Sequence, residues 1–211
     1  MKKGVEYLAS GEKRALDVTT ALALGSMALP VAVTGAAIFA RAYKLRVNEL
    51  FTVARRHGRG DDMVDVLKLQ TTPTDETLFA RRPISQKLAP YLKQAGVDEA
   101  PQLLNVLGGA MSIVGPRPMD DRALESYHDA DPILFEDWRV SYGSMKPGLC
   151  GASQILRHSK LDPNSPELIR RGMALDVTYA TEATLWGDVQ ILARTPRDLM
   201  GAVEEAFTQA A

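Results

Sequence analysis

The longest apolar stretch of the chain lies near its N-terminus. No charged residue occurs from Val18 to Ala40, and about 20 apolar residues are enough for one helix to cross a bilayer. Pro30 lies near the middle of the stretch, where its missing N–H and its ring favour a bend in the helix. Basic residues flank the stretch on both sides, at Lys2, Lys3, Lys13 and Arg14 before it and at Arg41, Lys44 and Arg46 after it.

Three interpretations of this stretch fit its composition. The first is a re-entrant membrane helix that bends at Pro30 and returns, the second is a single-pass anchor, and the third is a buried helix of a soluble protein. A straight span would place one basic flank on the wrong side of the membrane, whereas a re-entrant helix keeps both flanks on the cytoplasmic face. A secretory signal is not expected, because the apolar stretch exceeds the usual roughly 7–15 residues.

Shorter periodic segments follow. Residues 63–69 alternate between apolar and polar side chains, which predicts a half-buried strand. Residues 85–94 have the spacing of an amphipathic helix. Residues 120–142 read as helical segments divided by Pro132, and a closing amphipathic helix is expected over residues 186–193. The pattern therefore predicts an α/β fold that is mainly helical and has short strands.

Composition narrows the function classes. The chain has 211 residues and a net charge of -1, so it has no overall positive charge for binding nucleic acid. The single cysteine, Cys150, excludes an internal disulfide and fits a reducing compartment. The three histidines lie far apart in the sequence and lack the spacing of metal ligands.

Two adjacent carboxylates, Asp98 and Glu99, precede a run with helical spacing at Leu103, Leu104 and Leu107. We expect Asp98 to be the N-cap of this helix, with Pro101 tolerated in its first turn. A helix N-terminus carries a partial positive charge and unpaired N–H groups, so it attracts phosphate oxygens. The alternative is an ordinary capped helix with a solvated glutamate beside it.

Arg117 lies between Pro116 and Pro118. The following proline biases Arg117 toward an extended conformation, so that its guanidinium is held on a stiff arm. Carboxylates, a helix start and a rigid arginine together suggest chemistry on a phosphate. The alternative is a plain turn.

One long motif spans both features and resembles the signature of the bacterial sugar transferases, the monotopic phosphoglycosyl transferases. It reads Asp98-Glu99-x-Pro101-Gln102-Leu103-x-Asn105-Val106-Leu107-x-Gly109-x-Met111-Ser112-Ile113-Val114-Gly115-Pro116-Arg117-Pro118. Lys13-Arg14-x-x-Asp17, followed by a mid-membrane proline, resembles the re-entrant element of these enzymes. Their usual Ser-Pro pair is Leu29-Pro30 in this chain.

Weaker resemblances extend along the chain. The family's Lys-Phe-basic-Thr motif reads Lys68-Leu69-Gln70-Thr71, and Ala54 replaces a glutamine. Its Pro-Gly-x-x-Gly-Trp-x-Gln turn resembles residues 147–154, with Ala152 in place of the tryptophan and Arg157 as a stand-in for a downstream arginine. Its Leu-Asp-x-x-Tyr segment matches residues 175–179, which implies that Asp176 belongs to the site.

The resemblance implies a two-part organisation. Residues 1–46 would form the re-entrant membrane helix and its flanks, and residues 47–211 a cytoplasmic catalytic domain with amphipathic helices parallel to the interface. It also implies a location at the cytoplasmic face of a bacterial inner membrane. The implied partners are a nucleotide-sugar, polyprenyl phosphate and the cytoplasmic leaflet, with no nucleic acid, and a homodimer is left open.

The implied activity is transfer of a sugar-1-phosphate from a UDP-sugar to polyprenyl phosphate with release of UMP, the first membrane step of glycoconjugate assembly. By resemblance Asp98 is the nucleophile that forms an aspartyl-phosphosugar intermediate, and Glu99 is a ligand of Mg²⁺. Arg117 would hold phosphate oxygens bidentately. Lys68 and Arg157 would also face the substrate phosphates.

Two rival functions stay open. The first is a non-catalytic membrane relative that binds lipid or a protein partner, which the changes at Gln70, Ala54 and Ala152 favour and the intact motif opposes. The second is a soluble helical module. Single residues also have simpler interpretations. Lys68 could be the solvated end of a strand. The basic cluster of Arg55, Arg56 and Arg59 could bind lipid headgroups.

Overall fold

The computed structural model describes residues 2–43, 50–60, 62–70, 97–156, 162 and 165–195. Its elements in chain order are α1 (Lys2–Leu8), α2 (Gly11–Tyr43), β1 (Phe51–His57), β2 (Met63–Leu69), the 3-10 turn η2 (Val97–Glu99), α5 (Gln102–Leu107), β3 (Ser112–Val114), α6 (Asp121–Ala130), α7 (Pro132–Gly143), β4 (Gly148–Cys150), α8 (Ala152–Ile155), α9 (Pro166–Glu182) and a last helix over residues 185–195. The predicted mainly helical fold with short strands is confirmed. The helix expected over residues 85–94 lies outside the described residues.

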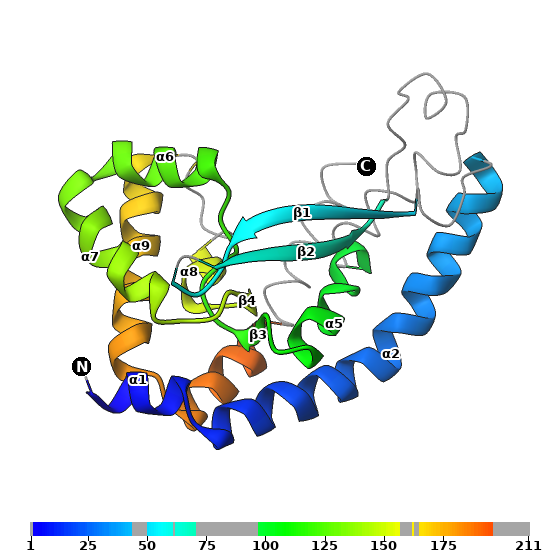
Figure 1. Cartoon of the computed structure of the whole chain (residues 1–211), viewed down its shortest axis with the longest axis horizontal. Coiled ribbons are helices and arrows are strands. Elements are labelled where there is room, and N and C mark those ends of the chain that lie inside the picture. The colour runs from blue at the N-terminus through cyan, green and yellow to red at the C-terminus, as the bar shows by residue number, and fades with distance from the viewer. Residues whose placement is uncertain are drawn as a thin grey trace.

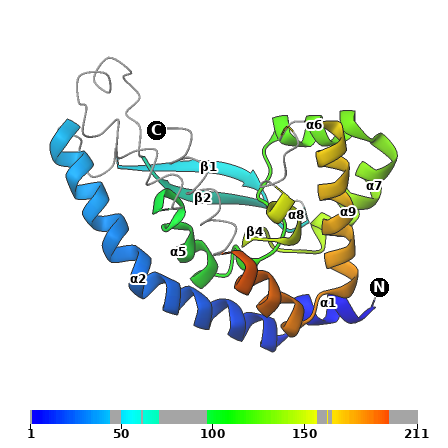
Figure 2. The same cartoon turned by 180° about the vertical axis from the view of Figure 1, so that it is seen from behind.

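Helix α2 is the longest element and runs along one side of the molecule (Figures 1 and 2). It continues through Pro30 without a break, and the Thr34 hydroxyl donates to the Pro30 carbonyl at 2.8 Å. The segment Gly11–Ile38 is long and apolar enough to cross a membrane, by length and composition only. Much of its apolar surface is exposed, including Met27 at 75% and Val33 at 65%. Length and exposed apolar surface fit both a helix that crosses a membrane and one that returns at Pro30, so the return stays a prediction.

Strands β1 and β2 form an antiparallel hairpin that lies over α5 (Figure 1), with Phe51 opposite Leu69 and His57 opposite Met63. The strand predicted over residues 63–69 is confirmed with the same bounds. Strand β1 was not predicted from the sequence, because two arginines, Arg55 and Arg56, follow directly on its apolar residues and hide the alternation.

Strands β3 and β4 form a short parallel pair, in which Ser112 is opposite Gly148 and Val114 is opposite Cys150. Beyond this pair, two backbones cross closely at Gly115 and Gly148. A Cβ on Gly148 would stand 2.2 Å from the Gly115 nitrogen, and a Cβ on Gly115 would stand 2.4 Å from the Lys146 carbonyl oxygen. Only glycine fits at this crossing, so the predicted Pro-Gly turn holds the segment before Arg117 in place.

Lys13 is the centre of a network that we call the buried joint, formed by Tyr7, Lys13, Asp17, Ser112, Tyr179 and Asp188. Its ammonium donates to Asp17 at 3.2 Å, to Asp188 at 2.8 Å and to the Val114 carbonyl at 2.9 Å. Lys13 is 4% exposed and Asp188 is fully buried. A buried charge is tolerated only when it is paired and hydrogen-bonded, and here both conditions are met.

The two carboxylates of the buried joint connect distant parts of the chain. Asp17 accepts the Ser112 hydroxyl at 2.8 Å and the Ile113 N–H at 2.9 Å, so α2 is fastened to β3. Asp188 accepts the hydroxyls of Tyr7 at 2.9 Å and Tyr179 at 2.8 Å. Burial, followed by the charge of Asp188, raises the pKa of both tyrosines.

Arg14 fastens α2 to α5. Its guanidinium donates to the carbonyls of Val106 at 2.6 Å and Leu107 at 2.7 Å, at the C-terminal end of α5. The last carbonyls of a helix have no partner within the helix, and a cation there also complements the helix dipole. The Lys13-Arg14-x-x-Asp17 motif is therefore the part of α2 that attaches it to the body of the protein.

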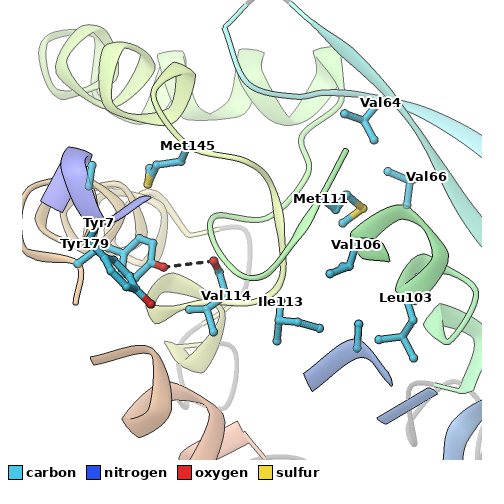
Figure 3. Close-up of a cluster of buried hydrophobic side chains, with 13 residues drawn as sticks. Tyr7, Val64, Val66, Leu103, Val106, Met111, Ile113, Val114, Met145 and Tyr179 are labelled. Atoms are coloured by element: carbon cyan, nitrogen blue, oxygen red, sulfur yellow. Dashed lines mark hydrogen bonds between the residues drawn. The ribbon is translucent and has the colours of Figure 1, made fainter. Parts of the chain in front are cut away.

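Apolar packing of the described residues forms three clusters, and the smallest joins Ala36 of α2 to Leu50 and Leu69. The largest brings Val66 from β2 together with Leu103, Val106 and Ile113 (Figure 3). In the same view the Tyr179 hydroxyl donates to the Val114 carbonyl, at 3.2 Å. The second cluster lies among α6, α7 and α9 and consists of Met119, Phe135, Trp138, Tyr142 and Met173. The two helices predicted around Pro132 are confirmed as α6 and α7.

Candidate functional site

A pocket of about 320 Å³ opens between the hairpin, the 3-10 turn η2, the segment after β3, and helices α8 and α9. It brings together charged residues from separate segments of the chain, which are Arg56, Lys68, Glu99, Arg117 and Asp120. Its floor and walls include apolar and small residues, among them Val66, Gly148 and Gly172. Three of the sequence-predicted site residues, Lys68, Glu99 and Arg117, therefore meet in one pocket.

The hairpin supplies two cations to the pocket, Arg56 from β1 and Lys68 from β2, because successive side chains of a strand point to alternate faces. Val64, Val66 and Lys68 point to one face of β2, since side chains two residues apart share a face. Val64 and Val66 are buried against the core, and Lys68 continues their row to the pocket edge. Arg56 is the register partner of Val64, so it shares this face and also lines the pocket.

The carboxylates of the predicted dyad lie in η2, and α5 begins only at Gln102. The predicted N-cap role of Asp98 is wrong. Pro101 is the N-cap residue with helical backbone angles, and no side chain caps α5. Glu99 lines the pocket and accepts the Lys68 ammonium at 3.1 Å, with the side chains of both about one third exposed. Asp98, its neighbour in η2, is partly exposed.

Asn105 fixes the distance between the dyad and the hairpin. Its side-chain oxygen accepts the Leu67 N–H at 3.3 Å, and its amide nitrogen donates to the Asp65 carbonyl at 2.8 Å. These two bonds tie α5 to β2 on either side of Val66. As a result Lys68 is held beside Glu99, so this asparagine positions the site without entering the pocket.

Arg117 lies in the segment after β3 and also lines the pocket. Among the residues that the structure describes, its guanidinium has no hydrogen-bond or ion-pair partner. Its backbone is firmly held, because the Tyr142 hydroxyl donates to the carbonyls of His57 at 2.7 Å and Arg117 at 3.3 Å. The same hydroxyl accepts the Met119 N–H at 3.3 Å. A rigid backbone with an unpaired guanidinium is an arrangement suited to receiving an anion.

Arg56 and Asp120 form an ion pair at the pocket wall. The N–H of Ala123 and the Arg56 guanidinium lower the pKa of Asp120, so this carboxylate stays ionised at neutral pH. With Arg56 and Lys68 each bonded to a carboxylate, Arg117 supplies the uncompensated positive charge of the described pocket lining.

Asp176 lies behind the pocket wall and not on its described lining. It is 2% exposed and accepts the indole N–H of Trp138 at 3.0 Å. Burial raises its pKa to about 6, and hydrogen bonds from Ser153 and Trp138 oppose that rise. Since Ser153 lines the pocket, Asp176 supports the wall from inside.

The remaining predicted positions are distributed as follows. Arg157 lies outside the described residues. Three of the positions that depart from the family pattern, Ala54, Gln70 and Ala152, are not part of the described pocket lining. These changes therefore leave the charged residues of the pocket in place.

In the described part of the chain, no three histidine, cysteine, aspartate or glutamate side chains gather as a metal site. Mg²⁺ is usually bound through one or two carboxylates together with substrate phosphates and water. The adjacent carboxylates of Asp98 and Glu99 fit that habit, because the remaining ligands would come with a phosphate-bearing substrate.

Sequence analysis missed several residues of the site. Arg56 stood in a basic cluster, and only the register of the hairpin separates it from Arg55, which is exposed on the other face. Tyr142 and Asp120 carried no signal, because their roles depend on partners that folding brings from elsewhere in the chain. Asn105 stood inside the motif, but its bonds to β2 are not visible in the sequence.

Comparisons with known proteins find a family and several relatives that match most of the chain. The family described as bacterial sugar transferase matches residues 8–202. A UDP-glucose:undecaprenyl-phosphate glucose-1-phosphate transferase of Caulobacter vibrioides is 34% identical over 196 residues, which are 89% of this chain and 69% of that protein. An undecaprenyl-phosphate glucose phosphotransferase of Komagataeibacter xylinus is 29% identical, covering 86% of this chain and 34% of that protein.

A third relative matches a shorter region. An undecaprenyl-phosphate galactose phosphotransferase of Salmonella typhimurium is 35% identical over 108 residues, which are 51% of this chain and 20% of that protein. The chain thus spans about two thirds of the first relative, and a third or less of the other two. The names of all three relatives include undecaprenyl phosphate; two of them name glucose as the sugar and the third names galactose.

Proposed function

Because the chain belongs to the bacterial sugar transferase family, we propose that it transfers a sugar-1-phosphate from a UDP-sugar to a polyprenyl phosphate and releases UMP. The observation that carries the proposal is the meeting of Lys68, Glu99 and Arg117 in one pocket. Two of these residues belong to the motif, and Lys68 comes from a separate strand. The reaction would start glycoconjugate assembly at the cytoplasmic face of the inner membrane.

In this proposal the Asp98 carboxylate attacks the phosphorus that carries the sugar. The new bond joins an Asp98 oxygen to that phosphorus, and UMP leaves with the electrons of the broken phosphoanhydride bond. An oxygen of the lipid phosphate then attacks the same phosphorus and releases Asp98. Covalent catalysis of this kind replaces one difficult transfer between two anions by two easier ones.

The positive groups of the pocket would make the approach of two anions possible. Arg117 would hold phosphate oxygens through two parallel N–H donors, a geometry that lysine cannot reproduce. Lys68 would exchange its bond to Glu99 for a substrate oxygen as the substrate enters. Glu99 would hold Mg²⁺ together with the diphosphate, and that ion would supply further positive charge beside the phosphorus.

We also propose that α2 enters the cytoplasmic leaflet and returns to the same side. This is supported by its apolar exposed surface and by its basic flanks. Single cysteines at Lys3 and Arg41 test it, because the native Cys150 is partly buried and burial raises its pKa to about 11, which keeps its background labelling low. In sealed inverted vesicles an impermeant maleimide should label both positions. Labelling of one position only would mean a single-pass helix.

The decisive experiment traps the proposed covalent intermediate. Purified protein is mixed with a panel of UDP-sugars and Mg²⁺ without polyprenyl phosphate, quenched in acid and digested. Mass spectrometry should find a phosphosugar on the peptide that contains Asp98, and UMP should be released in the same amount as the adduct. Adding polyprenyl phosphate should then give continuous UMP release.

Two variants control this experiment. Asp98→Asn should form no adduct and show no turnover, while Asp65→Asn, an exposed aspartate on β2, should behave as wild type. An adduct on another peptide, or full turnover by Asp98→Asn, would refute the nucleophile. If no UDP-sugar gives an adduct or UMP, the chain is a non-catalytic relative.

A further inference from the structure

A second and smaller cavity, of about 160 Å³, lies at the start of α2. It is bordered by Arg14 of α2, Arg59 of the β1–β2 turn, Lys146 before β4, and Ser10 and Ser112. Four positive side chains line it when the buried Lys13 is included, and Asp17 is the one carboxylate on its described lining. We propose that this cavity is a binding site for a phosphate group, separate from the catalytic pocket.

Lys13 is paired with Asp17 and Asp188, but in the described part of the chain the other three cations of the cavity have no carboxylate partner. Asp17 is already bonded to Lys13, Ser112 and the Ile113 N–H. Arg14 donates to two neutral carbonyls of α5, so its charge has no carboxylate partner in the described part of the chain. Within the same residues, neither Arg59 nor Lys146 forms an ion pair.

The cations come close to one another despite their repulsion. Arg14 Nη2 and Lys146 Nζ each lie 3.9 Å from the same point, the position that a Cβ on Gly109 would take. Burial first, and then the charges of Arg14 and Arg59, lower the pKa of Lys146. Like charges held together destabilise a fold, and an anion between them removes that cost.

The chemistry of the donors specifies the ligand class. A guanidinium and an ammonium are the groups with which proteins hold phosphate oxygens, and hydroxyls such as that of Ser10 donate to the same acceptors. A cavity of about 160 Å³ has room for a phosphate group. A phosphate of this kind has two sources here, an anionic lipid headgroup beside α2 and a free phosphate in solution.

The site is distinct from the catalytic pocket. Glu99 precedes the N-terminal end of α5, whereas Arg14 binds the carbonyls at its C-terminal end. Yet one short segment borders both cavities, because Lys146 lines the smaller one and Gly148 the larger one. An anion bound at Lys146 would therefore steady the glycine crossing that precedes Arg117.

The test measures how fast Lys146 itself reacts with an acylating reagent, by peptide mass spectrometry of detergent-solubilised protein. Inorganic phosphate should slow acylation of Lys146 at least threefold relative to chloride at equal ionic strength, since a bound anion shields the amine and favours its protonated form. In the Arg59→Gln variant, the same degree of protection should require at least five times more phosphate. Arg55→Gln, a matched exposed arginine of the same hairpin, should leave it unchanged.

Two further arms separate the sources and the sites. In nanodiscs without free phosphate, protection by phosphatidylglycerol but not by phosphatidylcholine would identify a lipid headgroup, and protection by inorganic phosphate alone would identify a soluble anion. Arg117→Gln should leave the protection intact, which separates this site from the catalytic pocket. Equal acylation rates in phosphate and chloride together with no lipid effect, or equal protection in Arg59→Gln and Arg55→Gln, would overturn the proposal.

Discussion

Lys13 and Lys68 both bind carboxylates, but their surroundings are opposite. Lys13 is 4% exposed and bonded to two aspartates and a carbonyl, while the side chains of Lys68 and Glu99 are about one third exposed. Loss of one partner from a buried ion pair strongly destabilises the fold, because the other charge is left buried and unpaired. A half-exposed pair contributes little to stability, so either partner can bind another ion instead. The buried joint is therefore suited to fixing the fold, and the Lys68–Glu99 pair to opening for a substrate.

The largest expected effect breaks the buried joint. Asp188→Asn removes the charge that faces Lys13 and weakens the bonds to Tyr7 and Tyr179, so the free energy of unfolding should fall by about 3–5 kcal/mol. Thermal unfolding in detergent measures this loss. Asp137→Asn on the exposed face of α7 is the control and should unfold as wild type does. An unchanged melting temperature in Asp188→Asn would mean that the joint adds no stability.

The next effect uses Asp176, a buried carboxylate that has no cation partner among the described residues. Burial raises its pKa to about 6, above the ordinary value of an aspartate. The folded state therefore holds the proton more tightly than the unfolded state. The contribution of Asp176 to stability is highest below pH 4, falls as the pH rises through 6, and is then constant.

Comparing wild type with Asp176→Asn isolates this effect. The stability of wild type relative to the variant should decline by up to about 3 kcal/mol between pH 4 and pH 7. Urea unfolding at a series of pH values measures it. A difference that does not change with pH would show that Asp176 has the same pKa in the folded and unfolded states.

The catalytic pocket should respond differently. Arg117→Lys keeps the charge but loses the paired N–H geometry, and a hydrogen bond to a charged group is worth about 1.5–3 kcal/mol. We expect kcat/KM to fall by roughly 10- to 100-fold, while the melting temperature stays within a degree or two. Arg139→Lys, an exposed arginine of α7, should change neither quantity. Unchanged kinetics of Arg117→Lys would make Arg117 a turn residue only.

The smallest expected effect on stability comes from the Lys68–Glu99 pair itself. Lys68→Gln should change the free energy of unfolding by less than about 1 kcal/mol, because exposed pairs of this kind contribute little. Its kcat/KM should nevertheless fall, and the loss should lie mainly in KM for the UDP-sugar. A large loss of stability with normal kinetics would reverse the comparison and make this pair structural.

The same contrast explains what the sequence could predict. Strand β2 follows from local alternation, and helices α6 and α7 follow from the helical segments on either side of Pro132. The pocket residues Glu99 and Arg117 were found because a continuous motif contains them. The cap predicted at Asp98 was wrong because α5 begins at Gln102 and its N-cap residue is Pro101, while Asp98 lies in the preceding 3-10 turn.

Most of the buried joint could not be predicted, since the bonds from α1 and α2 to Ser112 and Asp188 connect residues 95 to 181 positions apart. The Lys13-Arg14-x-x-Asp17 motif was recognised, but its residues were assigned to the membrane element alone. Ser112 lies inside the long motif and Asp188 outside any recognised motif, and nothing in either position indicated a bond to α2. Long-range polar pairs of this kind are set by packing, which the local sequence does not encode.

The bond between Asp17 and the Ile113 N–H has a consequence for how the protein would respond to its surroundings. Ile113 is four residues before Arg117, and α2 at about 1.5 Å per residue is roughly 50 Å long. Near its N-terminal end, α2 is hydrogen-bonded through Asp17 to β3, the strand that precedes Arg117. If α2 lies in lipid, a change in bilayer thickness that tilts it would turn that strand as well. Acyl-chain length would then regulate the enzyme without any ligand.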